Sequence, residues 1–329
     1  MPQVNKAISV LRSRGGPTLA GLAFFESFLE FVRRYNRKQL PVTYAIQTNG
    51  YAVDEKWAAF LAKNRFLVGI SVDGDKALHD EFRIDTAGKG TWMRTQKSLR
   101  LLQTAGVACN LLCVVTKRCA KSAIRTYHAL QKTGVGYLQF IPCLDPLGEE
   151  RGQRPWSLTP EDYGTFLCSL FDAWYRDWEN GPYTSVRLFD DYVHLAMGLP
   201  SSTCATSGRC GAYYVVEADG SVYPCDFYVL DEWKLGDIYQ TTLKGIGESE
   251  REVQFLRESL KKPNACDSCR WKYLCFGGCK RDCFFTENGD IRNYYCASYQ
   301  QFFGYAERRI NFIANEERKM RSQNSLNTL

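Results

Sequence analysis

The sequence predicts an α/β protein with a parallel sheet, followed by a smaller cysteine-rich domain. Two observations support this. Amphipathic helical stretches alternate with short apolar strands from about residue 18 to 141, and nine of the 14 cysteines lie between residues 204 and 296. Alternation of this kind indicates βαβ units, in either an open doubly wound sheet or a full or partial (β/α) barrel.

The elements of the first part follow from periodicity and from their end signals. Apolar strands are predicted at 42–50, 66–74, 107–116 and 136–142, and helices at 19–38, 54–64, 91–106 and 122–134. Gly106 and Gly134 are typical helix stops. Together these segments predict a first domain over residues 1–150 that is built on a parallel sheet, either open or closed into a full or partial barrel.

After residue 142 the alternation ends and different signals take over. A loop leads to a helix that starts at Thr159-Pro160-Glu161, where Thr is a typical N-cap and Pro suits the first turn. A hairpin is predicted to turn on Asp219-Gly220. We therefore expect a helical connection over 151–198, a cysteine-bearing domain over 199–300, and a closing helix from 298 to 322 with a frayed tail.

Composition excludes several classes of protein. The 329 residues are 45% hydrophobic and 24% charged with a net charge of +6, which is typical of a globular chain without a nucleic-acid-binding arm. The first sixteen residues hold only a five-residue, mostly apolar run, and no apolar stretch is long enough to span a bilayer. We predict a cytoplasmic protein, in which clustered thiols more often bind metal or carry redox chemistry than form disulfides.

The clustered cysteines have the spacing of metal ligands. Cys210 and Cys225 flank the hairpin, a C-x2-C-x5-C-x3-C run extends from Cys266 to Cys279, and Cys296 follows; with Cys204 this makes eight ligands. Spacing alone leaves four-thiolate zinc and iron–sulfur open. The three histidines, His79, His128 and His194, all lie outside this region and are interpreted as packing or surface residues.

The remaining cysteines carry less information. They stand in or beside predicted strands and helices, where a free Cys behaves as a small buried apolar residue. This interpretation is favoured for Cys109, Cys113, Cys119, Cys143 and Cys168.

Motifs of both predicted domains point to one known family. The pattern C-x9-G-x4-C, C-x2-C-x5-C-x3-C, then C resembles the SPASM auxiliary-cluster domain of radical S-adenosylmethionine enzymes, and "VYPCDFYVLDEWKLGDI" resembles their anaerobic sulfatase-maturating branch. Upstream, "GGPTLAGLAFF", "IQTNGY", "GISVDG" and "HDEFR" are similar to successive strand-end motifs of that family's barrel. The resemblance implies a partial (β/α)6 barrel joined to a SPASM domain.

The resemblance also implies roles for individual residues. One [4Fe–4S] cluster would be held by Cys204, Cys210, Cys225 and Cys279, and another by Cys266, Cys269, Cys275 and Cys296, with Cys283 left over. Ser71 and Arg83 would contact the S-adenosylmethionine ribose and carboxylate, with Leu144 near its adenine, although a surface salt bridge is the alternative for Arg83. Asp226 would be the general base, and an ordinary hairpin-end Asp is its alternative.

The family's C-x3-C-x2-C loop, whose thiolates bind the cluster that cleaves S-adenosylmethionine, is absent from the sequence. The family's G-G-E-P motif appears as Gly15-Gly16-Pro17, without the Glu. We therefore expect a truncated or frame-shifted gene model, a fragment, or a degenerate chain, lacking the first barrel strand and inactive as written. S-Adenosylmethionine and a third cluster would bind only in a full-length form.

The implied function is oxidation of a sulfatase Cys or Ser to formylglycine, with a sulfatase peptide between the two domains as substrate and a flavodoxin or ferredoxin as reductant. The alternatives are another peptide-modifying radical enzyme, such as one that makes thioether crosslinks, and a non-catalytic iron–sulfur or four-cysteine zinc module. Neither nucleic acid nor membrane is an expected partner.

Overall fold

The computed structural model describes residues 8–10 and 16–326, which divide into two compact units, Met1–Arg187 and Leu188–Leu329. Gly15 of the Gly15-Gly16-Pro17 motif lies outside the described residues. Within them, no helix combines the length and apolar character that crossing a membrane requires.

The first unit is built on a six-stranded parallel sheet whose strands follow one another in chain order. The strands are β1 (Ile8–Val10), β2 (Val42–Thr48), β3 (Phe66–Ser71), β4 (Ala108–Val115), β5 (Tyr137–Pro142) and β6 (Ser185–Val186). Parallel pairing in this order brings all the carboxyl ends to one edge, because each crossover helix returns the chain to the same starting side. The predicted α/β class and barrel-like sheet are confirmed.

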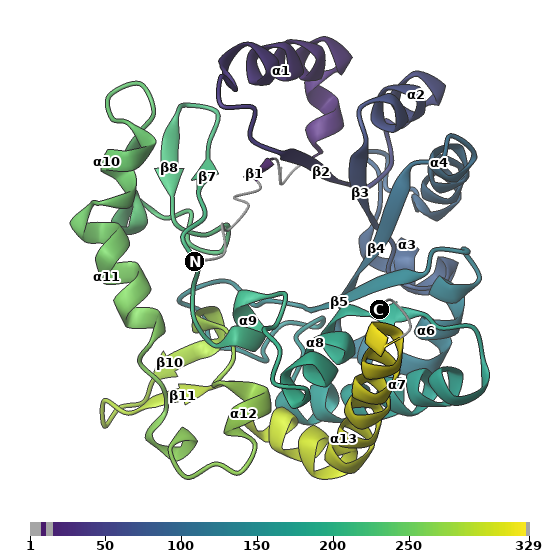
Figure 1. The fold of residues 1–329 in the computed structure, drawn as a ribbon, viewed down its shortest axis with the longest axis vertical. Helices are drawn as coiled ribbons and strands as arrows, with labels where there is room; N and C mark the ends of the chain where they lie inside the picture. The colour runs from purple at the N-terminus through teal and green to yellow at the C-terminus, as the bar shows by residue number, and fades with distance from the viewer. Residues whose placement is uncertain (1–7, 11–15, 327–329) are drawn as a thin grey trace. The chain divides into compact units, whose positions relative to one another are not determined.

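Helices connect the strands and cover one side of the sheet. They are α1 (Leu22–Tyr35), α2 (Glu55–Lys63), α3 (Lys76–Phe82), α4 (Trp92–Thr104), α5 (Lys117–Ala120), α6 (Ala123–Gln131) and α7 (Pro160–Asn180), with a short 3₁₀ turn at Pro17–Ala20. Figure 1 shows the strands following an arc with α1, α2 and α4 on its outer side. Phe25 of α1 and Phe66 of β3 are almost fully buried between these layers, with ring centroids 6.3 Å apart.

Side-chain caps set several helix starts. Asp54 accepts the Trp57 N–H at 2.9 Å, and Thr159 accepts the Asp162 N–H at 3.2 Å with Pro160 in the first turn, as the sequence predicted. The helix predicted over 19–38 is too long, because Gly21 (φ 80°) separates the 3₁₀ turn from α1. The short elements β1, α3, α5 and β6 were not predicted.

The second unit consists of short elements and one long helix. After α8 (Arg187–Ala196) come α9 (Cys204–Ser207), β7 (Val215–Val216), β8 (Ser221–Tyr223), η2 (Asp231–Trp233), β9 (Gly236–Asp237), α10 (Leu243–Gly247), α11 (Glu250–Ser259), η3 (Asn264–Cys266), α12 (Lys272–Cys275), η4 (Lys280–Asp282), β10 (Cys283–Phe285), β11 (Ile291–Asn293) and α13 (Cys296–Leu326). The predicted hairpin is present as β7–β8, to which β9 adds a third antiparallel strand.

Two small apolar cores support this second unit. Val222, Leu235 and Ile246 are buried together with Tyr214 against them, while Phe302 and Phe303 of α13 pack on Phe189 and Tyr192 of α8. The frayed tail predicted from residue 322 is wrong for its first part, because α13 continues to Leu326. The last three residues of that prediction lie outside the described part.

Candidate metal centres and ligand site

Four cysteines of the second unit that are far apart in the sequence interact electrostatically with one another in the fold. Cys204 begins α9, Cys210 follows that turn, Cys225 comes after β8, and Cys279 precedes η4. Burial raises the pKa of Cys210, and the Cys204 thiol adds to the shift. Burial likewise raises the pKa of Cys225 to about 11 and that of Cys279 well above its usual range, with Cys210 adding to both. We call these four residues the first thiol group.

The other four predicted ligands line one pocket. Cys266, Cys269, Cys275 and Cys296 surround it, and Trp271, Tyr299 and Phe303 form part of its wall. Burial raises the pKa of Cys275 to about 12, with contributions from Cys296, Cys266 and Cys269. We call these four residues the second thiol group. Its members come from η3, α12 and the start of α13 and the loops between them.

A turn of unusual backbone geometry separates the two groups in the chain. Phe276, Gly277 and Gly278 all have positive φ, at 49°, 82° and 72°. Three successive left-handed residues reverse the chain sharply between Cys275 of the second group and Cys279 of the first, and glycine adopts this conformation without steric penalty. The sequence "CFGGC" therefore gives the two cysteines different surroundings although only three residues separate them.

Cys283 has surroundings of its own. Its thiol donates to the Cys279 carbonyl at 3.5 Å and lies 3.9 Å from the Asn293 side-chain amide. It is not among the residues that line the pocket of the second thiol group. The assignment of Cys283 to neither ligand set stays a prediction.

The donor chemistry of each thiol group suits an iron–sulfur cluster. Four thiolates are the usual protein ligands of a [4Fe–4S] cluster, and burial that raises a thiol pKa opposes the thiolate unless a metal compensates for it. In the part of the chain that the structure describes, no three His, Cys, Asp or Glu side chains converge closely enough to hold one metal ion.

Asp226 lies directly beside the first thiol group. The Tyr213 hydroxyl donates to Asp226 Oδ1 at 2.8 Å and lies 3.4 Å from Cys225 Sγ. Burial raises the pKa of Tyr213, and Cys225 and Asp226 add to this shift, so the phenol stays protonated and donates. Sequence reasoning missed Tyr213, and nothing in the "YYVV" stretch distinguishes its contact from those of an ordinary strand tyrosine.

The three barrel residues predicted to bind S-adenosylmethionine have different situations. Ser71 ends β3 opposite Leu112 of β4, and Leu144 follows β5, so both are near the carboxyl edge of the sheet, on strands that β4 separates. Arg83, at the end of α3, instead forms a two-pronged ion pair with Asp73, with Nε to Oδ2 at 2.5 Å and Nη2 to Oδ1 at 3.2 Å. Sequence analysis gave a surface salt bridge as the alternative for Arg83; the ion pair present is partly buried, and the predicted contact of Arg83 with the cofactor stays a prediction. Asp73 also accepts the Val114 N–H at 2.8 Å, which ties this loop to β4.

Comparison with known proteins decides the family. A sequence profile described as "SPASM: Iron-sulfur cluster-binding domain" matches residues 206–270. The chain is 44% identical over 302 residues to the "Cysteine-type anaerobic sulfatase-maturating enzyme" of Clostridium perfringens, which covers 92% of this chain and 82% of the relative. The chain belongs to the anaerobic sulfatase-maturating enzymes. The resemblance to the radical S-adenosylmethionine enzymes predicted from the sequence is confirmed.

More distant and structural comparisons agree with membership of the anaerobic sulfatase-maturating enzymes. The "Serine-type anaerobic sulfatase-maturating enzyme" of Bacteroides thetaiotaomicron is 31% identical and covers 96% of this chain and 79% of the relative. The solved structure "Native anSMEcpe with bound AdoMet and Kp18Cys peptide" superposes with a TM-score of 0.90 at 43% identity, over 94% of this chain and 85% of that one. The profile description favours iron–sulfur over zinc for the thiols.

Proposed function

We propose that this chain supplies the proton acceptor and the electron outlet of an anaerobic sulfatase maturase, which oxidises a sulfatase cysteine to formylglycine. The observation that supports this proposal is the position of Asp226 beside the first thiol group, in a chain that belongs to the anaerobic sulfatase-maturating enzymes. Identity is higher to the cysteine-type relative (44%) than to the serine-type relative (31%), which supports cysteine as the preferred substrate residue.

The ligand assignment is part of this proposal. Cys204, Cys210, Cys225 and Cys279 would hold one [4Fe–4S] cluster, and Cys266, Cys269, Cys275 and Cys296 a second. When bound, these clusters supply one-electron redox chemistry, and S-adenosylmethionine supplies the hydrogen-abstracting radical in this class of enzyme. The C-x3-C-x2-C loop that serves S-adenosylmethionine cleavage is not among the 329 residues.

The chain's own residues would act on the proton and on the substrate's position. Asp226 would accept the proton of the substrate thiol, and Tyr213 would hold the carboxylate in place through its 2.8 Å hydrogen bond. In the barrel, Ser71 and Leu144 would contact S-adenosylmethionine at the carboxyl edge of the sheet. Arg83 would reach the cofactor carboxylate only after exchanging its Asp73 partner. A flavodoxin or ferredoxin would supply the electrons.

The test is conversion of a synthetic Cys-x-Pro-x-Arg peptide by this chain joined at its N-terminus to a segment that carries the family's C-x3-C-x2-C loop, because the 329 residues do not include that loop. The protein is purified anaerobically and given S-adenosylmethionine and a reductant, and the peptide is analysed by mass spectrometry. We expect loss of the cysteine sulfur, and slower reaction with the matching Ser peptide. Retention of the sulfur in a crosslink would instead support a thioether-forming enzyme.

A matched pair of variants makes this test specific to the proposed base. Asp226→Asn should abolish or strongly slow conversion, by at least about 10²-fold, because a positioned base typically contributes that much. The exposed Asp231 in η2 provides the control, and Asp231→Asn should leave conversion unchanged. Equal rates for the two variants would contradict the role of Asp226.

A further inference from the structure

Lys280 is a nearly buried cation directly after Cys279 of the first thiol group. Its side chain is 13% exposed, and its ammonium lies 4.2 Å from the ring centroids of both Trp233 and Phe255 and 5.1 Å from that of Tyr228. Aromatic faces attract a cation, and they exclude the water that would otherwise screen its charge. The chain thus keeps a lysine charge beside three aromatic rings, which we call the ring box, an arrangement that is costly unless the charge is paired.

The three rings hold one another in fixed orientations. Tyr228 and Trp233 each meet Phe255 edge to face at 5.1 Å, and they meet each other at 6.0 Å with an interplanar angle of 84°. Phe255 is fully buried in α11. Because each ring is packed against the other two, the lysine ammonium has a defined position.

Glu258, also in α11, forms an ion pair with Lys280. Its Oε2 lies 2.9 Å from the Lys280 ammonium. Burial raises the pKa of Glu258, but hydrogen bonds from Lys280 and Gln254 outweigh that effect and leave it below its usual value, so the carboxylate is charged at neutral pH. The pair is therefore a partly buried dipole, whose negative end is more exposed to solvent than its positive end.

The positive end of this dipole acts on the first thiol group. Lys280 directly follows Cys279, and the Tyr228 ring that its ammonium approaches at 5.1 Å belongs to a residue whose N–H donates to the Cys225 carbonyl at 2.9 Å. Tyr228, one wall of the box, also lies close to this group, since burial raises its pKa and the Cys279, Cys210 and Cys225 thiols add to the shift.

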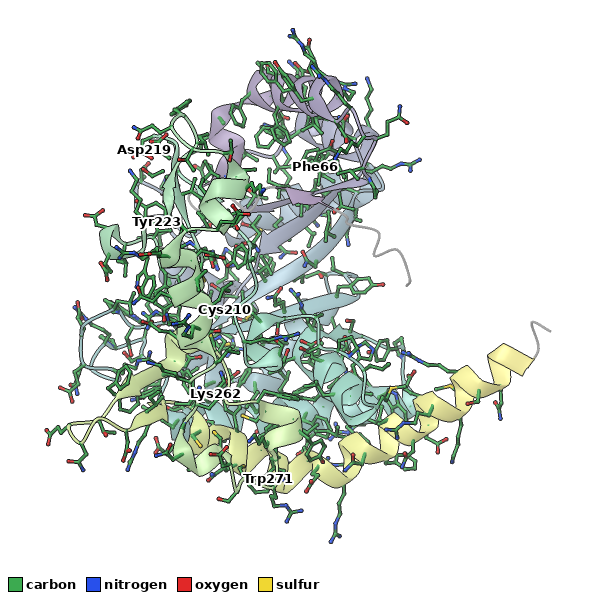
Figure 2. All side chains as sticks on the ribbon, turned by 60° about the vertical axis from the view of Figure 1, so that its left-hand side comes forward. Phe66, Cys210, Asp219, Tyr223, Lys262 and Trp271 are labelled. Carbon is green, nitrogen blue, oxygen red and sulfur yellow. The ribbon has the colours of Figure 1, made fainter. Side chains whose placement is uncertain are left out.

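The second thiol group has a different set of cations. Lys272, which acts on Cys266, is 53% exposed and paired with the exposed Asp267 at 3.0 Å, so solvent screens it. Lys262 interacts electrostatically with both groups, with Cys210 of the first and Cys266 of the second. Its Cδ lies 2.7 Å from the position that a Cβ at Gly277 would occupy. In Figure 2 its label stands between those of Cys210 and Trp271. Lys280 is thus a buried cation serving the first group.

We propose that Lys280 is a positioning residue that raises the reduction potential of the cluster held by the first thiol group relative to the cluster of the second. Reduction adds one electron to an already anionic cluster, so a fixed positive charge close by, in a poorly screened box, stabilises the reduced form. The inference rests on the proposed cluster assignment.

The experiment is a potentiometric titration of the anaerobically prepared holoprotein, with one-electron reduction by dithionite through mediator dyes and detection by electron paramagnetic resonance. Lys280→Met removes the charge but keeps an unbranched apolar side chain in the ring box. We expect one of the two reduction waves to move to lower potential. At a fixed potential, the ratio of reduced to oxidised cluster should fall about tenfold, which corresponds to a shift of about 59 mV for a one-electron couple.

Three companion variants separate charge from structure. Glu258→Gln removes the opposing charge and should move the same wave to higher potential, whereas Lys280→Arg keeps the charge and should leave it nearly in place. Lys272→Met removes a screened charge near the other group and should have a smaller effect, on the other wave. Opposite shifts from Lys280→Met and Glu258→Gln are not expected from a general loosening of the fold.

The outcomes are distinguishable from failure of the proposed function. Wild-type protein without two reducible clusters would overturn the cluster assignment, and the lysine inference with it. Two clusters whose waves stay fixed in Lys280→Met, or move in the same direction in Lys280→Met and Glu258→Gln, would overturn the lysine inference alone.

Discussion

Glu252 is a carboxylate placed where a folded chain rarely tolerates one. Its side chain in α11 is 1% exposed, and neither carboxylate oxygen has a hydrogen-bond partner within the described part of the chain. Burial raises its pKa above the usual 4.5. Nearby, burial raises the pKa of Tyr214 and the Glu252 charge adds to that shift. The titration of Glu252 therefore makes the stability of the second unit depend on pH.

We expect Glu252→Gln to stabilise the protein at neutral pH. The folded state binds more protons than the unfolded state between pH 4.5 and the raised folded pKa, so the wild-type free energy of unfolding falls as pH rises through this range. The variant lacks this titration, and it avoids the cost of a buried unpaired charge, so it should gain about 1–3 kcal/mol near pH 7.

Thermal midpoints of both proteins from about pH 4 to pH 8 provide the measurement, because the effect begins near the usual pKa of 4.5 and ends at the raised folded pKa. The difference between variant and wild type should widen with pH. A constant difference across the range would show that Glu252 does not titrate in the folded protein.

At the scale of elements, the first thiol group depends on a close contact between two turns. Gly208 follows α9 with φ 63°, and a side chain there would begin only 2.1 Å from the Phe276 carbonyl oxygen, in the turn after α12. Phe276 is itself left-handed at φ 49°. Only glycine at 208 lets these turns approach, so its residue type determines how close Cys204 and Cys210 come to Cys279.

Gly208→Ala should therefore reduce the iron content of the reconstituted protein by about half, through loss of the first cluster. The added methyl group would collide with the Phe276 backbone carbonyl, so the backbone itself would have to move. Gly211 provides a control in the same loop, because its added methyl group meets nothing within 4 Å. Iron analysis of both variants tests this, and equal iron contents would show that the contact is not needed.

The same scale shows what the sequence could predict. Strands β2 to β5 and helices α2, α4, α6 and α7 were predictable because each has a periodic apolar pattern and an end signal such as Asp54 or Thr159. Elements of two to four residues, such as β1 and β6, have no room for a pattern and form only because a neighbouring strand pairs with them. Arg83 shows a different limit: its partner Asp73 is ten residues away, and only the fold brings the pair together.

At the scale of the whole chain, the thiol groups could not have been deduced from spacing. Members of the first group come from residues 204 to 279, while Cys275 and Cys279, neighbours in sequence, belong to different groups. Family resemblance supplied that assignment, and the left-handed turn at Phe276–Gly278 gives it a physical reason. Tyr213 and Lys280 had no such signal, because their roles depend on contacts that the sequence does not show.

The assignment of Cys279 to the first thiol group, although Cys275 before it belongs to the second, makes a prediction about Cys279 and Cys283, which are only four residues apart. Cys279→Ser should remove a ligand of the first cluster and lower the iron content from about eight to about four atoms per chain. Cys283→Ser should keep about eight, because its thiol contacts the Cys279 carbonyl and the Asn293 amide rather than a thiol group, and a hydroxyl can make the same hydrogen bonds. Iron and sulfide analysis of anaerobically prepared variants, with the visible absorption spectrum as a second readout, tests both. Loss of iron in Cys283→Ser with retention in Cys279→Ser would exchange the two roles, and since β10 begins at Cys283, it would move the fourth ligand of the first cluster from the turn before η4 to the hairpin after it.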